Sequence, residues 1–216
     1  MRLHNIEDQK SITPLLALSF LKEGNQRFVS NLKANRNLLE QVNETKNGQF
    51  PFAVILSCID SRTSAELIFD QGLGDIFSVR IAGNVISDDV IGSMEFACKL
   101  AGSKLIVVLG HSKCGAITGA CKETKLGHLT NLLEKVSPSI EYVKEHHSDT
   151  DVKSIEGINL VASRHVEHTM EEVLDKSEVL RDMYEKGEIG VLGAFYNVET
   201  GEVDFIKTMF LENSTV

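Results

Sequence analysis

The sequence predicts an α/β fold: a central, mostly parallel sheet of four parallel strands plus an antiparallel edge strand, flanked by helices, with an N-terminal helical arm. Three observations lead to this prediction. Apolar runs such as 52–56 and 105–109 contain no polar position, as in strands buried on both faces. Helical patterns separate the runs, which indicates βαβ units with right-handed crossovers. Two late apolar runs joined by a polar turn indicate a hairpin that adds the antiparallel strand.

Length and composition favour one domain. The chain has 216 residues and no linker rich in Pro, Ser or Gly. A chain of this length can form one sizeable core. We therefore expect a single domain over 1–216, with an arm and loop at 1–49 and an α/β core at 50–208.

Charge and cysteine content exclude several classes of partner. The net charge is -9 and the basic residues are scattered, so we expect no nucleic-acid partner. We also expect no membrane partner, because no apolar run reaches membrane-spanning length, and the acidic N-terminus lacks a secretory signal. These features predict a cytoplasmic protein, in which four cysteines favour metal binding or packing over a disulfide framework.

The N-terminal region is expected to contain one helix. A polar leader ends near Ser11, and Thr13 before Pro14 fits an N-cap followed by the first helical position. Apolar residues at helical spacing extend this helix to about Ser30. It must then pack on the outside of the domain or against another subunit. The polar segment 31–49 predicts an irregular connection.

The first half of the core alternates strands and helices. Thr63, with Glu66 three residues later, gives a capping-box pattern, and Ser87 caps a later helix. The elements expected in order are a strand at 52–56, a helix at 63–69, a strand at 76–81, a helix at 87–100 and a strand at 105–109.

The second half is mainly helical and ends in the hairpin. Pro138 marks a break in one helical segment, and Ser177 marks an interruption in another. The elements expected in order are a helix from 115, helical structure at 126–146, an amphipathic pattern at 159–186, and strands at 189–196 and 203–206.

Two short motifs follow predicted strands and carry reactive side chains. Cys58, Asp60 and Arg62 follow the first strand, and His111 and Cys114 follow the third. If these strands are neighbours, both motifs lie at the carboxyl edge of the sheet, where open α/β sheets bind ligands. Two thiolates and an imidazole suit Zn²⁺ and leave a fourth position open for water. The alternative is an unconnected set of core thiols, because spacing alone does not pair distant ligands.

The remaining cysteines and several histidines are interpreted as structural. A lone buried cysteine usually packs as a small hydrophobic residue, and neither histidine pair has a cysteine or carboxylate set around it. We interpret Cys98 and Cys121 as core residues, and His146, His147, His165 and His168 as solvated or core-edge side chains.

Cys58-x-Asp60-x-Arg62 followed by His111-x-x-Cys114 resembles the zinc-site signature of the β-class carbonic anhydrases. The match continues through Val79-Arg80-x-Ala82-Gly83-Asn84 and into 193–201, so it covers nearly the whole domain. The resemblance implies one Zn²⁺ per chain and carbonate dehydratase activity, the reversible hydration of CO₂ to bicarbonate and a proton. It also implies a homodimer or a dimer of dimers.

The same resemblance assigns roles at the metal. Cys58, His111 and Cys114 match the three zinc ligands of the family. Asp60 and Arg62 match its Asp-Arg dyad, in which the arginine holds the carboxylate away from the metal so that water can bind.

Further positions match the substrate side of the site. Gln49 matches a glutamine that, in the open-site, plant-like subgroup, reaches across a dimer interface and hydrogen-bonds bicarbonate. Phe77 falls where the family has an apolar wall, and we expect Ala82 and Gly83 beside the substrate. Ala82 and Phe96 depart from the plant-like pattern, where Val and Tyr are common, which changes the shape of the pocket.

Physical chemistry supports the implied reaction. Carbonic anhydrase with a three-His site is the standard case in which Zn²⁺ lowers the pKa of bound water to about 7. Two thiolates donate more negative charge, so we expect a higher value here. Asp60 orients the zinc-bound hydroxide, and Arg62 keeps Asp60 ionised. Alternatively, Asp60 swings onto zinc and closes the site in a pH-dependent way. Because Gln49 favours the open subgroup, we expect Asp60 to stay off the metal at neutral pH.

Two alternative functions use the same ligands. A CS₂ or COS hydrolase differs in its access tunnel rather than at the metal. A non-catalytic domain with structural zinc needs a fourth permanent protein ligand, and the sequence shows no obvious Cys or His for it.

Overall fold

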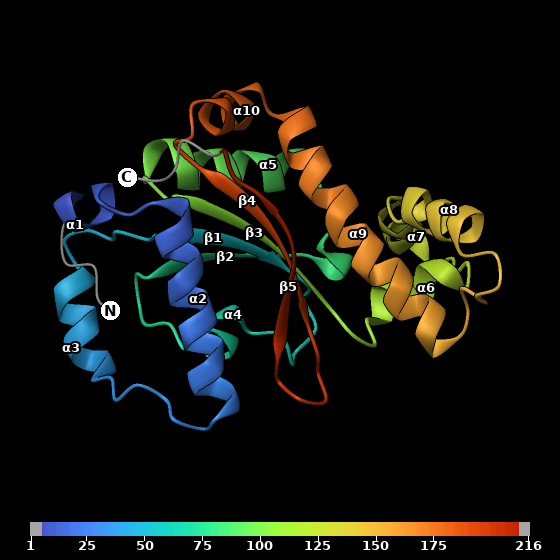
Figure 1. The fold of residues 1–216 in the computed structure, drawn as a ribbon, viewed down its shortest axis with the longest axis horizontal. Helices are drawn as coiled ribbons and strands as arrows, with labels where there is room; N and C mark the ends of the chain where they lie inside the picture. The colour runs from blue at the N-terminus through green and yellow to red at the C-terminus, as the bar shows by residue number, and fades with distance from the viewer. Residues whose placement is uncertain (1–5, 212–216) are drawn as a thin grey trace.

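A computed structural model describes residues 6–211. It consists of a five-stranded sheet with helices on both faces (Figure 1). The strand order is β2-β1-β3-β4-β5, and only the β4–β5 pair is antiparallel in this sheet. The strands are β1 (Ala53–Ser57), β2 (Ile76–Arg80), β3 (Leu105–His111), β4 (Gly190–Tyr196) and β5 (Val203–Met209). The predicted fold class is confirmed.

The helices connect and cover these strands. They are α1 (Ile6–Lys10), α2 (Pro14–Val29), α3 (Leu38–Thr45), α4 (Ala65–Ile68), α5 (Asp88–Glu95), α6 (Gly115–Cys121), α7 (Gly127–Glu134), α8 (Ser137–His146), α9 (Ile155–Lys176) and α10 (Glu178–Glu185), with a 3₁₀ turn η1 (Ala82–Asn84) and a π-helical turn η2 (Phe96–Leu100). The caps expected at Thr13 and Ser87 are present, and the interruption expected at Ser177 is the N-cap of α10; each side chain accepts a hydrogen bond from a backbone N–H in the first turn. No described helix is long and apolar enough to cross a membrane.

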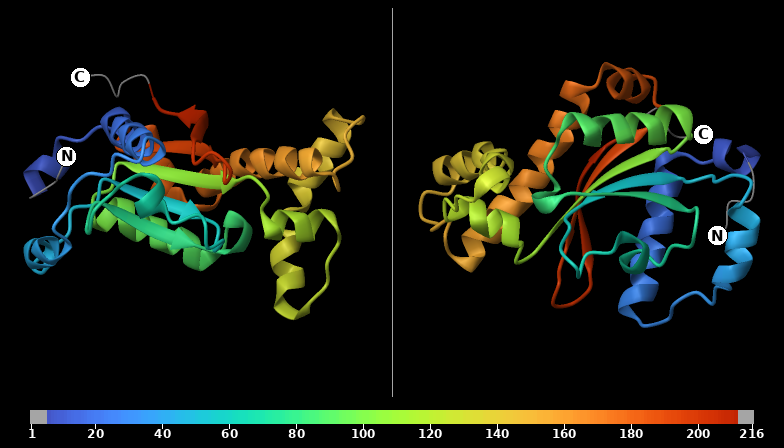
Figure 2. Two further views of the ribbon diagram at one scale, coloured as in Figure 1. Left: turned by 90° about the horizontal axis from the view of Figure 1, so that it is seen from below. Right: turned by 180° about the vertical axis from the view of Figure 1, so that it is seen from behind.

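Side chains alternate between the two faces of the sheet. In β1, Val54 and Leu56 join a cluster with α5, α9 and α10, whereas Ala53 and Ile55 join a cluster with α2 and α4. Seen along its edge, the sheet has α2 and α5 on opposite sides (Figure 2). Burial on both faces explains why the central strands are apolar at every position.

A third apolar cluster lies beyond the carboxyl ends of the strands. Helices α6, α7 and α8 and the first part of α9 form this lobe (Figure 1). Cys58 and Cys114 belong to the cluster, together with residues such as Ile117 of α6 and Val161 of α9. The lobe therefore encloses one side of the carboxyl edge, where both motifs emerge.

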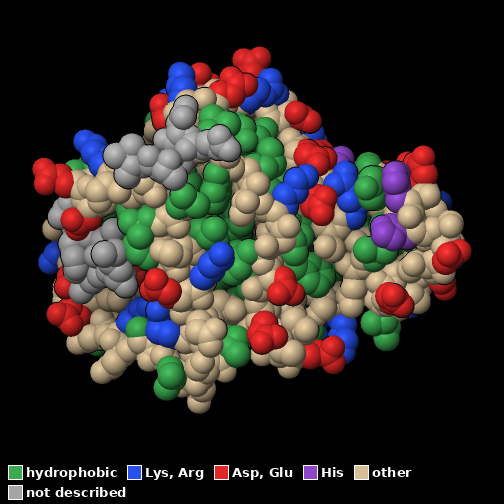
Figure 3. All heavy atoms as spheres, in the orientation of Figure 1, with side chains coloured by type: hydrophobic (Ala, Val, Ile, Leu, Met, Phe, Trp, Pro, Cys, Tyr) green, Lys and Arg blue, Asp and Glu red, His purple; other side chains and the backbone are tan. Residues whose placement is uncertain are grey.

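The arm is anchored by a close helix contact and by ion pairs. A Cβ on Gly24 of α2 would lie 1.8 Å from the carbonyl oxygen of Phe69, so this contact requires glycine. Just after α4, Asp70 pairs with Arg27 of α2 (2.6 Å) and with Arg36 (2.5 Å). Elsewhere on the face in Figure 3, basic and acidic side chains are interspersed.

Several predicted element boundaries were wrong. Segment 31–49 is not wholly irregular, because Asn37 caps α3 by accepting a hydrogen bond from the N–H of Glu40 (3.2 Å). The leader contains α1, whose Gln9 side chain donates to the carbonyls of Pro51 (2.8 Å) and Ala101 (2.7 Å). Ser64 rather than Thr63 precedes α4 as its N-cap residue. In both N-terminal cases, a polar side chain has a structural role: Asn37 caps its own helix, and Gln9 attaches α1 to the core.

The second half also has different limits. Ser154 caps α9 earlier than expected by accepting from the N–H of Gly157 (3.0 Å). Strand β5 continues to Met209, beyond the predicted end at 206, because it pairs along β4 as far as Val191. The predicted helix at 87–100 is divided into α5 and η2.

Candidate metal centre

The sheet register brings the two cysteine motifs to one edge. Strands β1 and β3 are parallel neighbours, with Ser57 opposite Leu109. Cys58 follows β1 directly, and His111 ends β3. A tight turn with Lys113 at φ 55° then leads to Cys114, the N-cap residue of α6.

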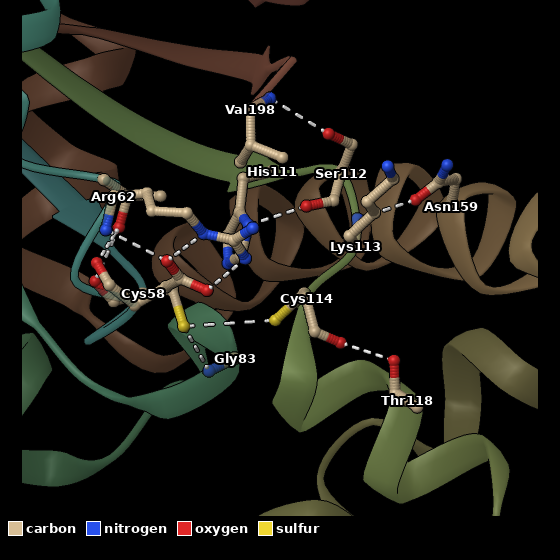
Figure 4. Close-up of polar contacts among 12 residues, drawn as sticks. Cys58, Arg62, Gly83, His111, Ser112, Lys113, Cys114, Thr118, Asn159 and Val198 are labelled. Atoms are coloured by element: carbon tan, nitrogen blue, oxygen red, sulfur yellow. Dashed lines mark hydrogen bonds and ion pairs between the residues drawn. The ribbon is translucent and has the colours of Figure 1, made fainter.

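Three donor atoms meet at this edge. The side-chain donors of Cys58, His111 and Cys114 all lie within 4.8 Å of one another. The two sulfur atoms are 3.9 Å apart and form no disulfide (Figure 4). All three residues are buried, with exposures of 3% or less. Residues far apart in sequence thus form one compact set of metal-ligating groups.

The imidazole of His111 has one engaged and one unpartnered nitrogen. Nδ1 lies 2.9 Å from the carbonyl oxygen of Ser112. Because a carbonyl only accepts, Nδ1 carries the proton and Nε2 presents its lone pair. Among the described residues, buried Nε2 has no hydrogen-bond partner. This is the arrangement of a metal-ligating histidine, whose other nitrogen donates to a carbonyl or carboxylate.

The surroundings of Cys58 favour its thiolate. Hydrogen bonds from the Cys114 side chain and from the backbone N–H of Gly83 lower the pKa of Cys58 despite its burial. The Gly83 N–H lies 3.4 Å from Sγ, and Gly83 has φ 68°. The neighbouring Cys58 sulfur and burial raise the pKa of Cys114, which the backbone N–H groups of Ala116 and Ile117 partly oppose. These donors suit sulfur ligands that carry negative charge.

The donor set fits zinc. Thiolate and imidazole together are typical ligands of Zn²⁺. The orphaned Nε2 of His111 gives a structural reason for a cation, because a buried polar atom without a partner is unfavourable. Asp60 is not a member of the donor cluster.

Asp60 is held by Arg62 within the same loop. Its Oδ1 accepts from Nε (2.9 Å) and from the backbone N–H (3.0 Å), and its Oδ2 accepts from Nη2 (2.7 Å). The Arg62 guanidinium holds the pKa of the Asp60 carboxyl well below its usual range. Asp60 is therefore ionised at neutral pH, and its carboxylate is turned toward the arginine.

Sequence reasoning missed the residues that support these loops. Thr63, expected to cap a helix, donates through Oγ1 to the carbonyls of Cys58 (3.1 Å) and Asp60 (2.9 Å). Arg80 donates to the same two carbonyls. One sequence feature could have pointed to Arg80 as a supporting residue: it is a charged residue at the end of a strand, just before the Ala-Gly-Asn turn.

A second set supports the turn that carries His111 and Cys114. Ser112 Oγ accepts from the N–H of Val198 (3.0 Å), and Asn159 Oδ1 accepts from the N–H of Lys113 (3.0 Å) (Figure 4). Nothing in the sequence pairs these distant residues in advance.

A cavity of about 500 Å³ adjoins the donor cluster. Cys58, Asp60 and Ala82 line it at one end, and α6 and α7 form the rest of its wall with mostly small and apolar residues. Gly83 donates its N–H to Cys58, so it supports the sulfur directly.

Phe77 and Gln49 lie elsewhere in the chain. The Phe77 ring packs against Phe96 with ring centroids 6.1 Å apart, and both line a hollow beside β2. Gln49 lies before β1, whereas Cys58 follows it, so the two are at opposite ends of that strand. Neither residue reaches the donor cluster of its own chain.

The structural interpretation of the other cysteines and histidines was right in part. Cys98 and Cys121 are buried in apolar clusters, and burial raises the pKa of Cys98 to about 12. His165 is fully buried, contrary to the expectation of a solvated or core-edge position. Its Nδ1 lies 3.2 Å from Ser139 Oγ, and burial lowers its pKa to about 4. His165 is buried because α9 packs between the sheet and the lobe at this position and has no solvated face there.

Comparison with known proteins identifies related chains. Residues 53–203 match a family described as carbonic anhydrase. "Carbonic anhydrase 2" of Mycobacterium tuberculosis is 35% identical over 196 residues, which cover 87% of this chain and 90% of the relative. The carbonic anhydrase of Mycolicibacterium smegmatis is 33% identical, with coverage of 88% and 92%. The crystal structure of the β-carbonic anhydrase CafA of Aspergillus fumigatus superposes with a TM-score of 0.71 at 27% identity, covering 92% of each chain.

Proposed function

The chain belongs to the β-class carbonic anhydrases, and from this premise we propose that it is a zinc enzyme for the reversible hydration of CO₂ to bicarbonate and a proton. The observation that supports zinc most directly is the convergence of two sulfurs and the free Nε2 of His111. Cys58, His111 and Cys114 would hold the ion. A bound Zn²⁺ lowers the pKa of coordinated water and supplies hydroxide at neutral pH.

Asp60 orients the nucleophile in this proposal. Oδ1 already accepts two hydrogen bonds from Arg62, whereas Oδ2 accepts only one, so Oδ2 can also accept a hydrogen bond from the attacking oxygen. Arg62 keeps Asp60 ionised and directs it away from the ligand cluster. We therefore infer an open site at neutral pH, with Asp60 off the metal.

The cavity supplies the substrate environment. CO₂ is small and apolar, and Ala82 with the small residues of α6 offers an apolar wall next to Cys58 and Asp60. The N–H of Gly83 is directed to Cys58, which limits its contact with substrate in this proposal.

We further propose that the active form is a homodimer or a dimer of dimers. Helix α3 exposes Leu38, Leu39 and Val42, and Leu39 is 79% exposed. Apolar side chains grouped in this way are typical of a protein interface. A second chain would also bring Gln49 and Phe77 to the site, which their own chain does not do. Two predictions stay as such: the division into an arm and loop at 1–49 and an α/β core at 50–208, and the cytoplasmic location.

The two alternatives differ in observable ways. A CS₂ or COS hydrolase would use the same donors and differ in the access tunnel, so turnover of CO₂ against CS₂ or COS separates it from a carbonic anhydrase. A structural zinc domain would need a fourth permanent ligand, whereas the cluster among the described residues contains three donors beside a cavity.

The test is metal content measured together with turnover. Purified protein is assayed for zinc by mass spectrometry and for CO₂ hydration across pH, with CS₂ and COS hydrolysis assayed in parallel. The proposal expects one zinc per chain and hydration that increases with pH. Stoichiometric zinc without turnover of any substrate would indicate the structural alternative, and preferential turnover of CS₂ or COS would indicate the hydrolase.

A further inference from the structure

The loop that carries Cys58 and Asp60 depends on hydrogen bonds to its backbone. Its carbonyl oxygens at Cys58 and Asp60 each accept hydrogen bonds from two different side chains. Thr63 donates to each through Oγ1, at 3.1 Å and 2.9 Å. Arg80 donates to each as well, through Nε to Cys58 (3.1 Å) and through Nη2 to Asp60 (2.7 Å).

Arg80 differs from the other partners in where it comes from. Arg62 and Thr63 belong to the same loop as Asp60 or adjoin it, so they move with it. Arg80 is the last residue of β2, where it lies opposite Ser57 of β1. Its guanidinium therefore links the loop to the sheet, while Arg62 only sets the carboxylate within the loop.

The geometry requires a guanidinium. Two carbonyls, separated by Ile59, receive two N–H groups from one planar side chain. Arginine offers donors in a fixed fork, whereas lysine carries a single ammonium that is easily rotated. Hydrogen bonds from a charged donor are also stronger than neutral ones.

We propose that Arg80 is a positioning residue, which fixes the backbone at Cys58 and Asp60 against β2 and so sets the Asp60 carboxylate relative to the three metal-ligating side chains. The inference rests on the proposed function, since it assigns Arg80 a part in that site. Arg80 touches neither substrate nor the ligand atoms of the cluster. It acts through the loop.

The chain contains a matched control for this contact. Arg181 of α10 makes the same pair of bonds, from Nε to the carbonyl of Leu174 (2.9 Å) and from Nη2 to that of Asp175 (2.6 Å). These carbonyls lie at the end of α9, away from the donor cluster. Arg181→Met removes an equivalent pair of hydrogen bonds. It therefore measures how much such a pair contributes to thermal stability where no metal-ligating residue is involved.

The experiment compares Arg80→Met, Arg80→Lys and Arg181→Met with the wild type. Each protein is loaded with Zn²⁺ for CO₂ hydration and with Co²⁺ for its visible absorption spectrum, and thermal unfolding is followed. We expect Arg80→Met to keep its metal but lose roughly 10- to 100-fold in activity, mainly in kcat, as for other residues that orient a metal site. Its cobalt spectrum should change, Arg80→Lys should be intermediate, and Arg181→Met should match the wild type in both.

The outcomes separate this inference from the proposed function. A wild-type spectrum and kcat in Arg80→Met would overturn it, as would equal changes in Arg181→Met. If Arg80→Met does not fold, Arg80→Lys decides by the same readouts. If the wild type binds zinc but does not hydrate CO₂, the proposed function fails, while the cobalt spectra still test whether Arg80 positions the site.

Discussion

Both carboxylate oxygens of Asp60 are bound by Arg62, at 2.9 Å to Nε and 2.7 Å to Nη2, although three donor atoms cluster at the same sheet edge. The carboxylate is thereby kept out of the cluster of Cys58, His111 and Cys114. A site with three donors and a neighbouring ionised acid can bind a cation and still leave room for a water to react.

Replacing Asp60 by Asn tests its role in the reaction. Asn is nearly isosteric but uncharged, so it orients the nucleophile poorly, whereas the three donors are untouched. We expect zinc content near that of the wild type and CO₂ hydration reduced by roughly 100-fold or more. Asp149→Asn, on an exposed loop, serves as the control. Activity retained in Asp60→Asn would remove Asp60 from the mechanism.

Replacing Cys114 by Ala tests the metal ligands. Loss of one sulfur leaves a two-donor cluster, so we expect zinc to fall far below one per chain and the midpoint of thermal unfolding to decrease. Cys98→Ala is the matched control, because Cys98 is equally buried but lies in another cluster. It should keep its zinc. Unchanged metal stoichiometry in Cys114→Ala would exclude Cys114 as a ligand.

The sequence was sufficient for the sheet and for the local motifs. Apolar strands and residue identity at strand ends predicted the parallel core and the meeting of Cys58 with Cys114. The α3 helix was missed because its polar residues resemble those of a loop, and its apolar residues are exposed. The support from Arg80 could not be predicted, because it depends on the register between β1 and β2.

Asp70 should make stability depend on pH. Burial raises the pKa of Asp70, but the hydrogen bonds from Arg27 and Arg36 lower it by a larger amount. The pKa in the folded protein therefore lies below the usual value. Its stabilising effect is therefore complete above the unfolded pKa of about 3.9 and is lost as pH falls through the lower folded value. Asn suits the left-handed backbone at Asp70 (φ 44°), so Asp70→Asn adds little strain.

The measurement is the free energy of unfolding of wild type and Asp70→Asn in denaturant at several pH values. At pH 7 we expect the variant to be less stable by roughly 2–4 kcal/mol, since a mostly buried ion pair is broken. The difference should shrink as pH falls from 5 toward 2. A difference that is constant over this range would show that the Asp70 charge does not stabilise the arm.

A mixing experiment tests whether Gln49 acts across a dimer. Gln49 and Cys58 lie at opposite ends of β1, so one chain does not supply both to the same site. We expect Gln49→Ala and Asp60→Asn each to have low activity alone. In a mixed dimer, the chain with intact Asp60 would receive Gln49 from its partner, giving one complete site.

Random exchange of subunits in a two-fold dimer should then restore about a quarter of wild-type activity. Exchange itself is measured by co-purification of differently tagged chains, and unmixed samples control for slow recovery. If exchange occurs but the two variants together remain as inactive as they are apart, Gln49 does not complete a partner's site, and the dimeric arrangement of the substrate pocket must be abandoned.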